Sequence, residues 1–196
     1  MKDGAIFSIG HSTQPIDRLV GILKQHQIEV VADVRSSPFS RFNPQFNRES
    51  VAEALRGSAI KYLFLGKELG ARADDPSCYV NGKVKYSRLA ARKEFKEAIA
   101  RLLKGAIDHR IALMCAEKEP LECHRTILVS QELSKCGCEV RHIHYDGSLE
   151  THSAALERLL DMTGVPKTDL FKSWNDLLGE ALVIQESRIA YQETGP

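Results

Sequence analysis

The sequence predicts an α/β fold: a Rossmann-like three-layer domain with a mostly parallel sheet of about five strands, followed by a C-terminal helical extension. Three observations predict it. Short apolar segments of strand length alternate along the chain with longer segments whose apolar residues recur at helical spacing. The second of the short segments is apolar on both faces, which is typical of a strand covered by helices on both sides. The 196 residues are enough for one such domain and short for two.

Five segments are predicted to be strands. Each is short and mostly apolar, and polar residues follow each one. The segments are "AIFSIG" (5–10), "IEVVADVRS" (28–36), "IKYLFLG" (60–66), "RIALMCA" (110–116) and "EVRHIHY" (139–145). Because helical segments separate them, the strands are expected to run parallel in one sheet.

Five segments are predicted to be helices from their apolar periodicity: 11–27, 47–57, 87–105, 121–137 and 169–182. In the first of them, Ser12 or Thr13 can cap the helix and Pro15 suits its first turn. Gly57 is expected to end the second helix, and Gly137 is expected to be the C-cap of the fourth.

Two regions depart from the alternation of strands and helices. Residues 67–86 are polar and rich in glycine and charge, and a loop of this length inside a compact domain tends to be functional or mobile. Residues 149–196 look helical, and we expect an extension that packs on the α/β domain (residues 1–148) or on a partner subunit. Its clearest helix has an apolar stripe of Leu170, Trp174, Leu177, Leu178 and Ala181.

The composition limits the classes of function. The 27 basic and 26 acidic residues leave a net charge of +1, so charge alone does not indicate nucleic-acid binding, although a local basic patch is compatible with this total. No apolar run approaches the roughly 20 residues of a membrane span, and the N-terminal run is too short for a signal peptide. Five cysteines at irregular spacing fit reduced thiols better than a disulfide framework. We expect a cytoplasmic monomer or homodimer that does not bind membranes.

Polar residues gather where the predicted strands end. In a parallel α/β sheet the carboxyl ends of the strands share one edge, and ligands bind at that edge. The polar stretches are "IGHS" (9–12), "DVRSSPFSR" (33–41), "LGKELG" (65–70), "CAEKEPLECHR" (115–125) and "HYDGS" (144–148). Five polar strand ends on one edge predict a cleft there.

Candidate roles follow from the chemistry of these side chains. A cationic mouth that suits a phosphate or carboxylate is expected from Arg35, Arg41, Lys67, Arg72 and Arg125. We assign substrate binding to Ser12, Asp33, Arg35, Ser37, Arg41, Lys67, Cys123 and Arg125. Proton transfer or nucleophilic attack is assigned to Glu117, His11, His124 and Cys115. Structural alternatives stay open, since Asp33 and Arg35 can form a buried ion pair and Cys115 can be a small core residue.

The stretch 115–125 fits an anion-binding turn best. Pro120 suits the first position of a helix, which would place Cys123, His124 and Arg125 in its first two turns. A helix start with an adjacent arginine attracts negative charge and lowers the pKa of a nearby thiol. We therefore expect this turn to receive an anion.

Three other interpretations of the same stretch are weaker. A metal site from Cys115, Cys123, His124 and His11 would have the spacing Cys-x7-Cys-His, which is not a compact zinc pattern, so no metal ligand and no other cofactor is assigned. A redox pair of the two cysteines would lack the CxxC spacing. The Cys-x5-Arg phosphatase loop is excluded, because Arg125 lies ten residues beyond Cys115.

The blocks "IGHS", "DVRSSPFSR", "LGKELG" and "LMCAEKEPLECHR" resemble the signature blocks of an uncharacterised family catalogued as domain of unknown function 488. The resemblance runs from about Ala5 to Tyr145. It implies a cytosolic, single-domain α/β protein of prokaryotic type, and it brings no established reaction. Members tend to carry two glycines and an arginine after the third strand. This chain has Ala71 at the second glycine position, which puts in question any need for positive φ there.

The leading hypothesis is an enzyme that binds a small anionic ligand at the carboxyl edge of the sheet. A phosphate-bearing, nucleotide-like substrate is favoured by analogy with the fold class. No GxGxxG follows a predicted strand, so the standard dinucleotide fingerprint is absent. Two alternatives stay open: a non-enzymatic module that binds nucleic acid or a protein partner, and a metal- or thiol-dependent sensor.

Overall fold

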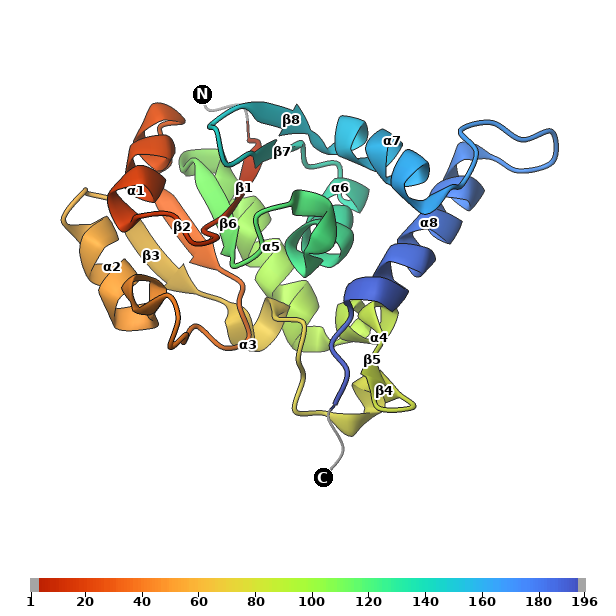
Figure 1. The fold of residues 1–196 in the computed structure, drawn as a ribbon, viewed down its shortest axis with the longest axis horizontal. Helices are drawn as coiled ribbons and strands as arrows, with labels where there is room; N and C mark the ends of the chain where they lie inside the picture. The colour runs from red at the N-terminus through yellow and green to blue at the C-terminus, as the bar shows by residue number, and fades with distance from the viewer. Residues whose placement is uncertain (1–3, 194–196) are drawn as a thin grey trace.

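The computed structural model describes residues 4–193 and contains a six-stranded sheet with helices on both faces (Figure 1). The strands are β1 (Ile6–Gly10), β2 (Val30–Asp33), β3 (Lys61–Phe64), β6 (Ile111–Cys115), β7 (Val140–Ile143) and β8 (Leu149–Thr151). Their order across the sheet is β3-β2-β6-β1-β7-β8. The first five are parallel to their neighbours, which confirms the predicted mostly parallel sheet. β8 adds an antiparallel edge, and its three residues are too few for alternation to reveal it.

The two faces of the sheet are covered by different helices. α1 (Ile16–Gln25) and α2 (Arg48–Arg56) cover one face, and their buried residues form one apolar cluster with the side chains of that face. The other face carries α5 (Lys93–Asp108), α6 (Gln131–Lys135), α7 (His152–Thr163) and α8 (Trp174–Ile189). Figure 1 shows α1 and α2 on one side of the strands and α5, α6 and α8 on the other.

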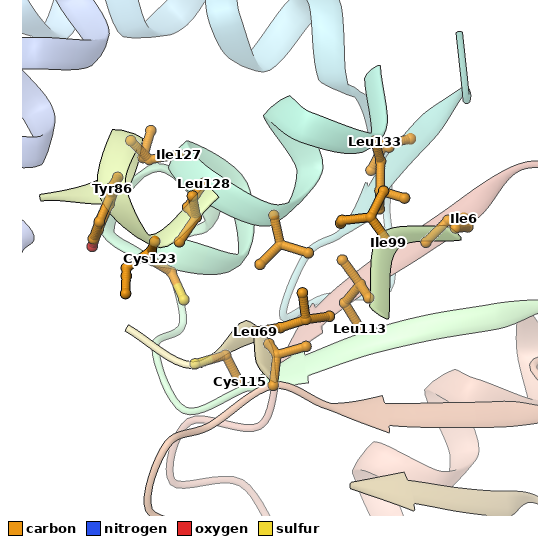
Figure 2. Packing of buried hydrophobic residues seen from close by; sticks show 14 of the residues in the cluster. Ile6, Leu69, Tyr86, Ile99, Leu113, Cys115, Cys123, Ile127, Leu128 and Leu133 are labelled. Atoms are coloured by element: carbon orange, nitrogen blue, oxygen red, sulfur yellow. The ribbon is translucent and has the colours of Figure 1, made fainter. Parts of the chain in front are cut away.

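The alternation of side chains along β6 determines where Cys115 points. Ala112 and Met114 belong to the cluster under α1 and α2, whereas Leu113 and Cys115 belong to the cluster under α5, α6 and α8. Figure 2 shows Cys115 and Cys123 among the packed side chains of this second cluster. Cys115 is therefore a core residue at the last position of a central strand.

The segment 121–137 differs from the single helix predicted for it. Pro120 begins the 3-10 turn η3 (Pro120–Glu122), and Cys123 is extended with φ −137° and ψ 140°. The π-helix η4 (Arg125–Ser130) follows and continues into α6. The prediction that Cys123 lies within the first turns of a helix is therefore wrong: an extended backbone at Cys123 separates η3 from η4.

Other helix boundaries also need correction. The predicted helix 87–105 is two helices, α4 (Tyr86–Ala91) and α5, because Arg92 is extended with φ −61° and ψ 144°. α1 begins after Pro15 with no side-chain cap, so neither Ser12 nor Thr13 caps it. Ser12 instead has a φ of 49° and donates its backbone N–H to the Ala116 carbonyl at 2.9 Å.

The polar region 67–86 contains short elements rather than a plain loop. It begins within α3 (Gly66–Leu69) and passes through the 3-10 turn η2 (Pro76–Cys78) to the hairpin of β4 (Tyr79–Val80) and β5 (Lys83–Val84). The C-terminal segment pairs with this hairpin, since the Val84 N–H donates to the Tyr191 carbonyl at 3.0 Å. In Figure 1 the segment that follows α8 runs beside β4 and β5.

The C-terminal helices pack against the sheet domain. Leu177, Leu178 and Ala181 of α8 are buried, and Gln185 Nε2 donates to the Leu121 carbonyl at 2.8 Å. The predicted stripe is only partly correct, because α8 begins at Trp174. Residues 164–173, between α7 and α8, are not helical, and Leu170 is 94% exposed. Among residues 4–193, no helix has the length and apolar character needed to cross a membrane.

Candidate functional site

A cleft of about 260 Å³ opens at the carboxyl edge of the sheet, where the neighbouring strands β2 and β6 end. Three regions distant in sequence build its wall: the segments after these strands, the region 71–86, and the C-terminal segment. The lining residues are Arg35, Ser36, Ser37, Ala71, Arg72, Tyr86, Cys115, Ala116, Glu117, Glu122, Cys123, His124, Ile189 and Tyr191. The cleft therefore lies where parallel α/β sheets bind their ligands.

Three buried side chains meet in the wall of this cleft. Cys115 Sγ lies 3.7 Å from His124 Nδ1, and Cys123 Sγ lies 3.9 Å from the same nitrogen. The two sulfurs and Nδ1 all lie within 4.8 Å of one another. Cys115, Cys123 and His124 therefore form a compact sulfur–nitrogen cluster, which we call the Cys–Cys–His cluster.

The backbone holds the His124 ring in one orientation. His124 Nε2 lies 3.0 Å from the Val34 carbonyl oxygen. A carbonyl only accepts, so Nε2 carries a proton and donates it. Nδ1 is then the ring nitrogen that faces both sulfurs. Val34, the residue directly after β2, thus orients a side chain that belongs to the segment after β6.

Glu117 lies beside the cluster and is open to the cleft. Its Oε2 accepts a hydrogen bond from Cys123 Sγ at 2.9 Å. Desolvation against the buried cluster, followed by the negative charge of Cys123, raises the pKa of Glu117. Burial would raise the pKa of the Cys123 thiol as well. The Cys115 hydrogen bond and the positive charges of Arg125 and His124 outweigh it and lower that pKa well below its ordinary value.

Cys115 and His124 respond differently to the same surroundings. Burial, followed by the hydrogen bond and charge of Cys123, raises the pKa of the Cys115 thiol well above its ordinary value. Burial lowers the pKa of the His124 imidazole, but the hydrogen bond to Cys123 and the charge of that thiolate raise it overall. The same surroundings therefore shift the two thiols in opposite directions, with the pKa of Cys123 lowered and the pKa of Cys115 raised.

Arg125 anchors the turn that carries Glu117. Its guanidinium is 0% exposed, and it donates to the Glu117 carbonyl at 2.7 Å and to the Lys118 carbonyl at 3.4 Å. Gly10, at the end of β1, lies under the same turn. A Cβ on Gly10 would be 1.8 Å from the Glu117 carbonyl oxygen, so only glycine fits there. Arg125 and Gly10 thus fix the backbone between the two cysteines.

Asp33 and Arg35 form a buried ion pair in which Arg35 lines the cleft and Asp33 lies behind its wall. Arg35 Nε and Nη2 donate to the two Asp33 carboxylate oxygens at 2.9 and 2.6 Å, and Tyr62 donates to Asp33 at 2.7 Å. Arg35 Nη1 donates to the Phe46 carbonyl and to His11 Nε2, at 2.9 and 3.0 Å. Most of the Arg35 donors are engaged within the protein, which agrees with the structural alternative for this pair.

His11 belongs to that network and is not in the lining of the cleft. Its Nδ1 donates to the Ser12 carbonyl at 2.8 Å, so Nε2 is the acceptor for Arg35. Burial lowers the pKa of His11 to about 4, even though the Ser12 carbonyl opposes the shift. His11 is therefore a neutral, hydrogen-bonded link between β1 and β2.

The predicted site residues fall into three groups. Those that line the cleft are Arg35, Ser37, Cys115, Glu117, Cys123 and His124. Those buried behind its wall are His11, Asp33 and Arg125. Outside the lining are Arg41 and Lys67, which are exposed, and Ser12, which is half-buried. Of the expected cationic mouth, only Arg35 and Arg72 reach the cleft. The catalytic and binding roles themselves stay predictions.

Several lining residues were not assigned from the sequence. Ala71 and Tyr86 come from the polar region that the sequence marks as functional or mobile, the same region that supplies the predicted Arg72. Ala71 has no positive φ, so the absence of a second glycine causes no strain at this position. Ile189 is the last residue of α8, and Tyr191 reaches the cleft through the pairing of the C-terminal segment with β5. Both positions depend on long-range contacts, which no local sequence pattern predicts.

The Cys–Cys–His cluster is the set of His, Cys, Asp and Glu side chains, within the described range 4–193, that is compact enough to hold a metal ion. No glycine-rich phosphate loop and no second cysteine knuckle accompany it. Thiolate and imidazole donors suit zinc and other thiophilic metals.

The comparisons with known proteins agree with the sequence blocks. Residues 15–131 match the family described as Domain of unknown function DUF488, which covers β2, β3, β6 and most of the residues that line the cleft. No curated protein sequence and no solved structure matches the chain. The match extends over more than half of the 196 residues, and the chain belongs to the DUF488 family.

Proposed function

We propose that this protein is an enzyme that binds a small anionic substrate in the cleft and transforms it beside Glu117 and the Cys–Cys–His cluster. The observation that carries the proposal is the convergence of reactive groups on one small cavity. Glu117, Cys123 and His124 all line a cleft of about 260 Å³ at the carboxyl edge of the sheet. A cavity of this size suits a metabolite rather than a polymer.

The residues that line the cleft offer two kinds of chemistry. Ser36, Ser37 and Arg72 have hydroxyl and guanidinium groups that can donate to an anion. Arg72 stacks on the Tyr191 ring, with its guanidinium carbon 4.3 Å from the ring centroid, and has no carboxylate partner within residues 4–193. Glu117 also lines the cleft, and it is close enough to the cluster to move a proton. An anionic group held by Arg72 would therefore direct the rest of the substrate towards Glu117.

The experiment is a thermal-shift screen with nucleotides, sugar phosphates and inorganic phosphate. A ligand at about 100 times its Kd stabilises the folded state by about 2.7 kcal/mol, which is about 5–10 °C for a protein of this size. The Arg72→Ala variant should lose most of this shift. Arg41→Ala is the matched control, because Arg41 is also an exposed arginine but does not line the cleft.

Two outcomes would oppose the proposal. One is a screen in which no anionic compound raises the melting temperature of the wild type. The other is an equal loss of the shift in Arg72→Ala and Arg41→Ala, which would place binding outside the cleft. Once the screen identifies a ligand, the Glu117→Gln variant should keep the thermal shift and lose the ability to convert that ligand. The amide keeps the shape of the side chain but cannot transfer a proton.

A further inference from the structure

We propose that Cys115, Cys123 and His124 bind one thiophilic divalent metal ion, with Zn²⁺ as the expected occupant, and that the fourth coordination position opens to the cleft. This metal site is independent of which substrate the cleft takes. The sequence does not favour it, because Cys-x7-Cys-His is not a compact zinc pattern. Spacing along the chain, however, tests only for ligands from one short loop. Here the fold brings the end of β6 and the start of η4 together.

The distances are those of a metal site that is nearly formed. Zinc bonds of about 2.3 Å to sulfur and about 2.0–2.1 Å to nitrogen, arranged tetrahedrally, place sulfur and nitrogen roughly 3.6 Å apart. The two sulfur–nitrogen separations here are 3.7 and 3.9 Å. The three donor atoms lie within 4.8 Å of one another, so small shifts of the cysteine side chains suffice to close around an ion.

The surroundings of His124 are those that a metal-bound histidine requires. A ligating imidazole donates its other N–H to a carbonyl or carboxylate, and this bond selects the nitrogen that binds the metal. The bond from His124 Nε2 to the Val34 carbonyl, at 3.0 Å, does this and leaves Nδ1 facing the two sulfurs. The backbone N–H of Arg125 also points to Cys123 Sγ, at 3.5 Å, where it can stabilise a thiolate.

Charge balance favours a divalent ion. Two thiolates and a neutral imidazole neutralise a 2+ charge, so the occupied site buries no net charge of its own. Binding of the ion releases two protons. One comes from the Cys115 thiol, and the other from the hydrogen-bonded group of Cys123, Glu117 and His124. These protons pass to solvent, and no oxidation or reduction occurs.

The open position gives the site a use. Cys115, Cys123 and His124 all line the cleft, so the side of the ion not covered by them faces it. A set of three protein ligands and one open position is typical of catalytic zinc sites, whereas structural sites use four protein ligands. Glu117 Oε2 lies 2.9 Å from Cys123 Sγ, which places the carboxyl group next to the open position, where it can take a proton from a water molecule on the metal.

The test is Co²⁺ binding to the full chain after treatment with a chelator, measured without any substrate. We expect one equivalent of Co²⁺ to bind and to give sulfur-to-cobalt charge transfer together with the intense d–d bands of tetrahedral coordination. Zn²⁺ should displace it. Protein purified without chelators or a histidine tag should contain close to one equivalent of zinc by elemental analysis.

The variants Cys115→Ser, Cys123→Ser and His124→Ala should weaken Co²⁺ binding by more than about 100-fold. Loss of a residue that only hydrogen-bonds to a metal ligand lowers metal affinity by about 10- to 100-fold, and loss of a ligand itself should lower it further. Cys136→Ser and Cys138→Ser are matched controls that should bind like the wild type, because these thiols lie outside the cluster. Far-UV circular dichroism identifies any variant that fails to fold. If a variant does not fold, a labelling experiment on the wild type replaces it. Bound Co²⁺ should slow the reaction of Cys115 and Cys123 with a maleimide.

The proposal is overturned if the wild type binds no Co²⁺ with charge transfer, or if Cys136→Ser abolishes the binding. It is also overturned if Cys115 and Cys123 react with maleimide equally fast with and without the ion. Because no substrate enters this experiment, failure of metal binding leaves the thermal-shift result for Arg72→Ala intact, and the two proposals can fail separately.

Discussion

Replacing Gly10 with alanine should strongly lower the stability of this protein, although it adds a single methyl group. A Cβ at this position would lie 1.8 Å from the Glu117 carbonyl oxygen and 3.2 Å from Arg125 Nη2. A contact below 3.0 Å is not found for real Cβ atoms, so the carbonyl must move by about 1.2 Å, the difference between 3.0 and 1.8 Å. The obstacle is backbone, which cannot rotate away as a flexible side chain can.

The magnitude follows from two costs. Overpacking a tight interior costs about 1–3 kcal/mol. Moving the carbonyl also breaks the 2.7 Å bond that it accepts from Arg125, and a lost hydrogen bond to a buried charged group costs about 1.5–3 kcal/mol. Together we expect Gly10→Ala to lower the free energy of unfolding by about 3–5 kcal/mol. For a domain of this length the melting temperature should fall by about 6–20 °C.

Urea unfolding followed by circular dichroism measures this change. The matched control is Gly21→Ala, because Gly21 lies in α1, is exposed, and has nothing within 4 Å of an added Cβ. Since alanine is favoured over glycine inside a helix, the control should gain about 0.5–1 kcal/mol. If Gly10→Ala unfolds within about 1 kcal/mol of the wild type, the turn after β6 is not held against β1 as described, and the reasoning fails.

Three further predictions concern the buried polar groups and one helix cap. Arg35→Met should cost about 3–5 kcal/mol of unfolding free energy in urea titration, because it leaves the buried Asp33 carboxylate without its two charged donors. The double variant with Asp33→Asn should cost clearly less than the sum of the single variants, and simple additivity would contradict the ion pair. Burial lowers the pKa of His152 to about 4 and lowers that of His142 well below its usual range. The unfolded chain then binds more protons below pH 6.5, so stability is full above that pH and should fall by roughly 2 kcal/mol per histidine at pH 5. His152→Gln should reduce this slope between pH 7 and 5, and an unchanged slope would refute the assignment. Ser173→Ala should cost about 1 kcal/mol in a thermal melt, since Ser173 and Asp176 form a capping box at the start of α8; no change would mean that the box does not stabilise the helix.

The fold was largely predictable because central parallel strands leave a strong trace in sequence. β2 and β6 are apolar on both faces, and this pattern marks them without any tertiary information. The break at Arg92 leaves no such trace. Neither glycine nor proline marks it, and the apolar spacing continues across it from α4 into α5. The sequence therefore predicts correctly that this segment is helical. It does not predict the break into α4 and α5, which depends on packing.

The edge of the sheet that holds the cleft was predictable from topology alone, since parallel strands end together. The different roles of the arginines were not predictable from the sequence. Arg125 is fully buried against backbone carbonyls, Arg35 is held by Asp33, and Arg72 reaches the cleft from a region without regular periodicity. These differences depend on contacts between distant segments. Local sequence shows only that each residue is an arginine near a strand end.

In the folded chain, the cysteines of the stretch 115–125 lie closer together than their spacing indicates. The two cysteines are separated by the turn at Pro120, and a spacing rule treats that separation as evidence against a shared ligand. In the structure Arg125 binds back to the carbonyls of Glu117 and Lys118, which closes the turn and brings the sulfur atoms to one imidazole. Arg125 therefore acts on the site through the backbone. A lysine in its place could not span both carbonyls with a planar fork, so Arg125→Lys should loosen the cluster even though the charge is kept. A cationic residue whose only role was to attract an anion would tolerate that exchange.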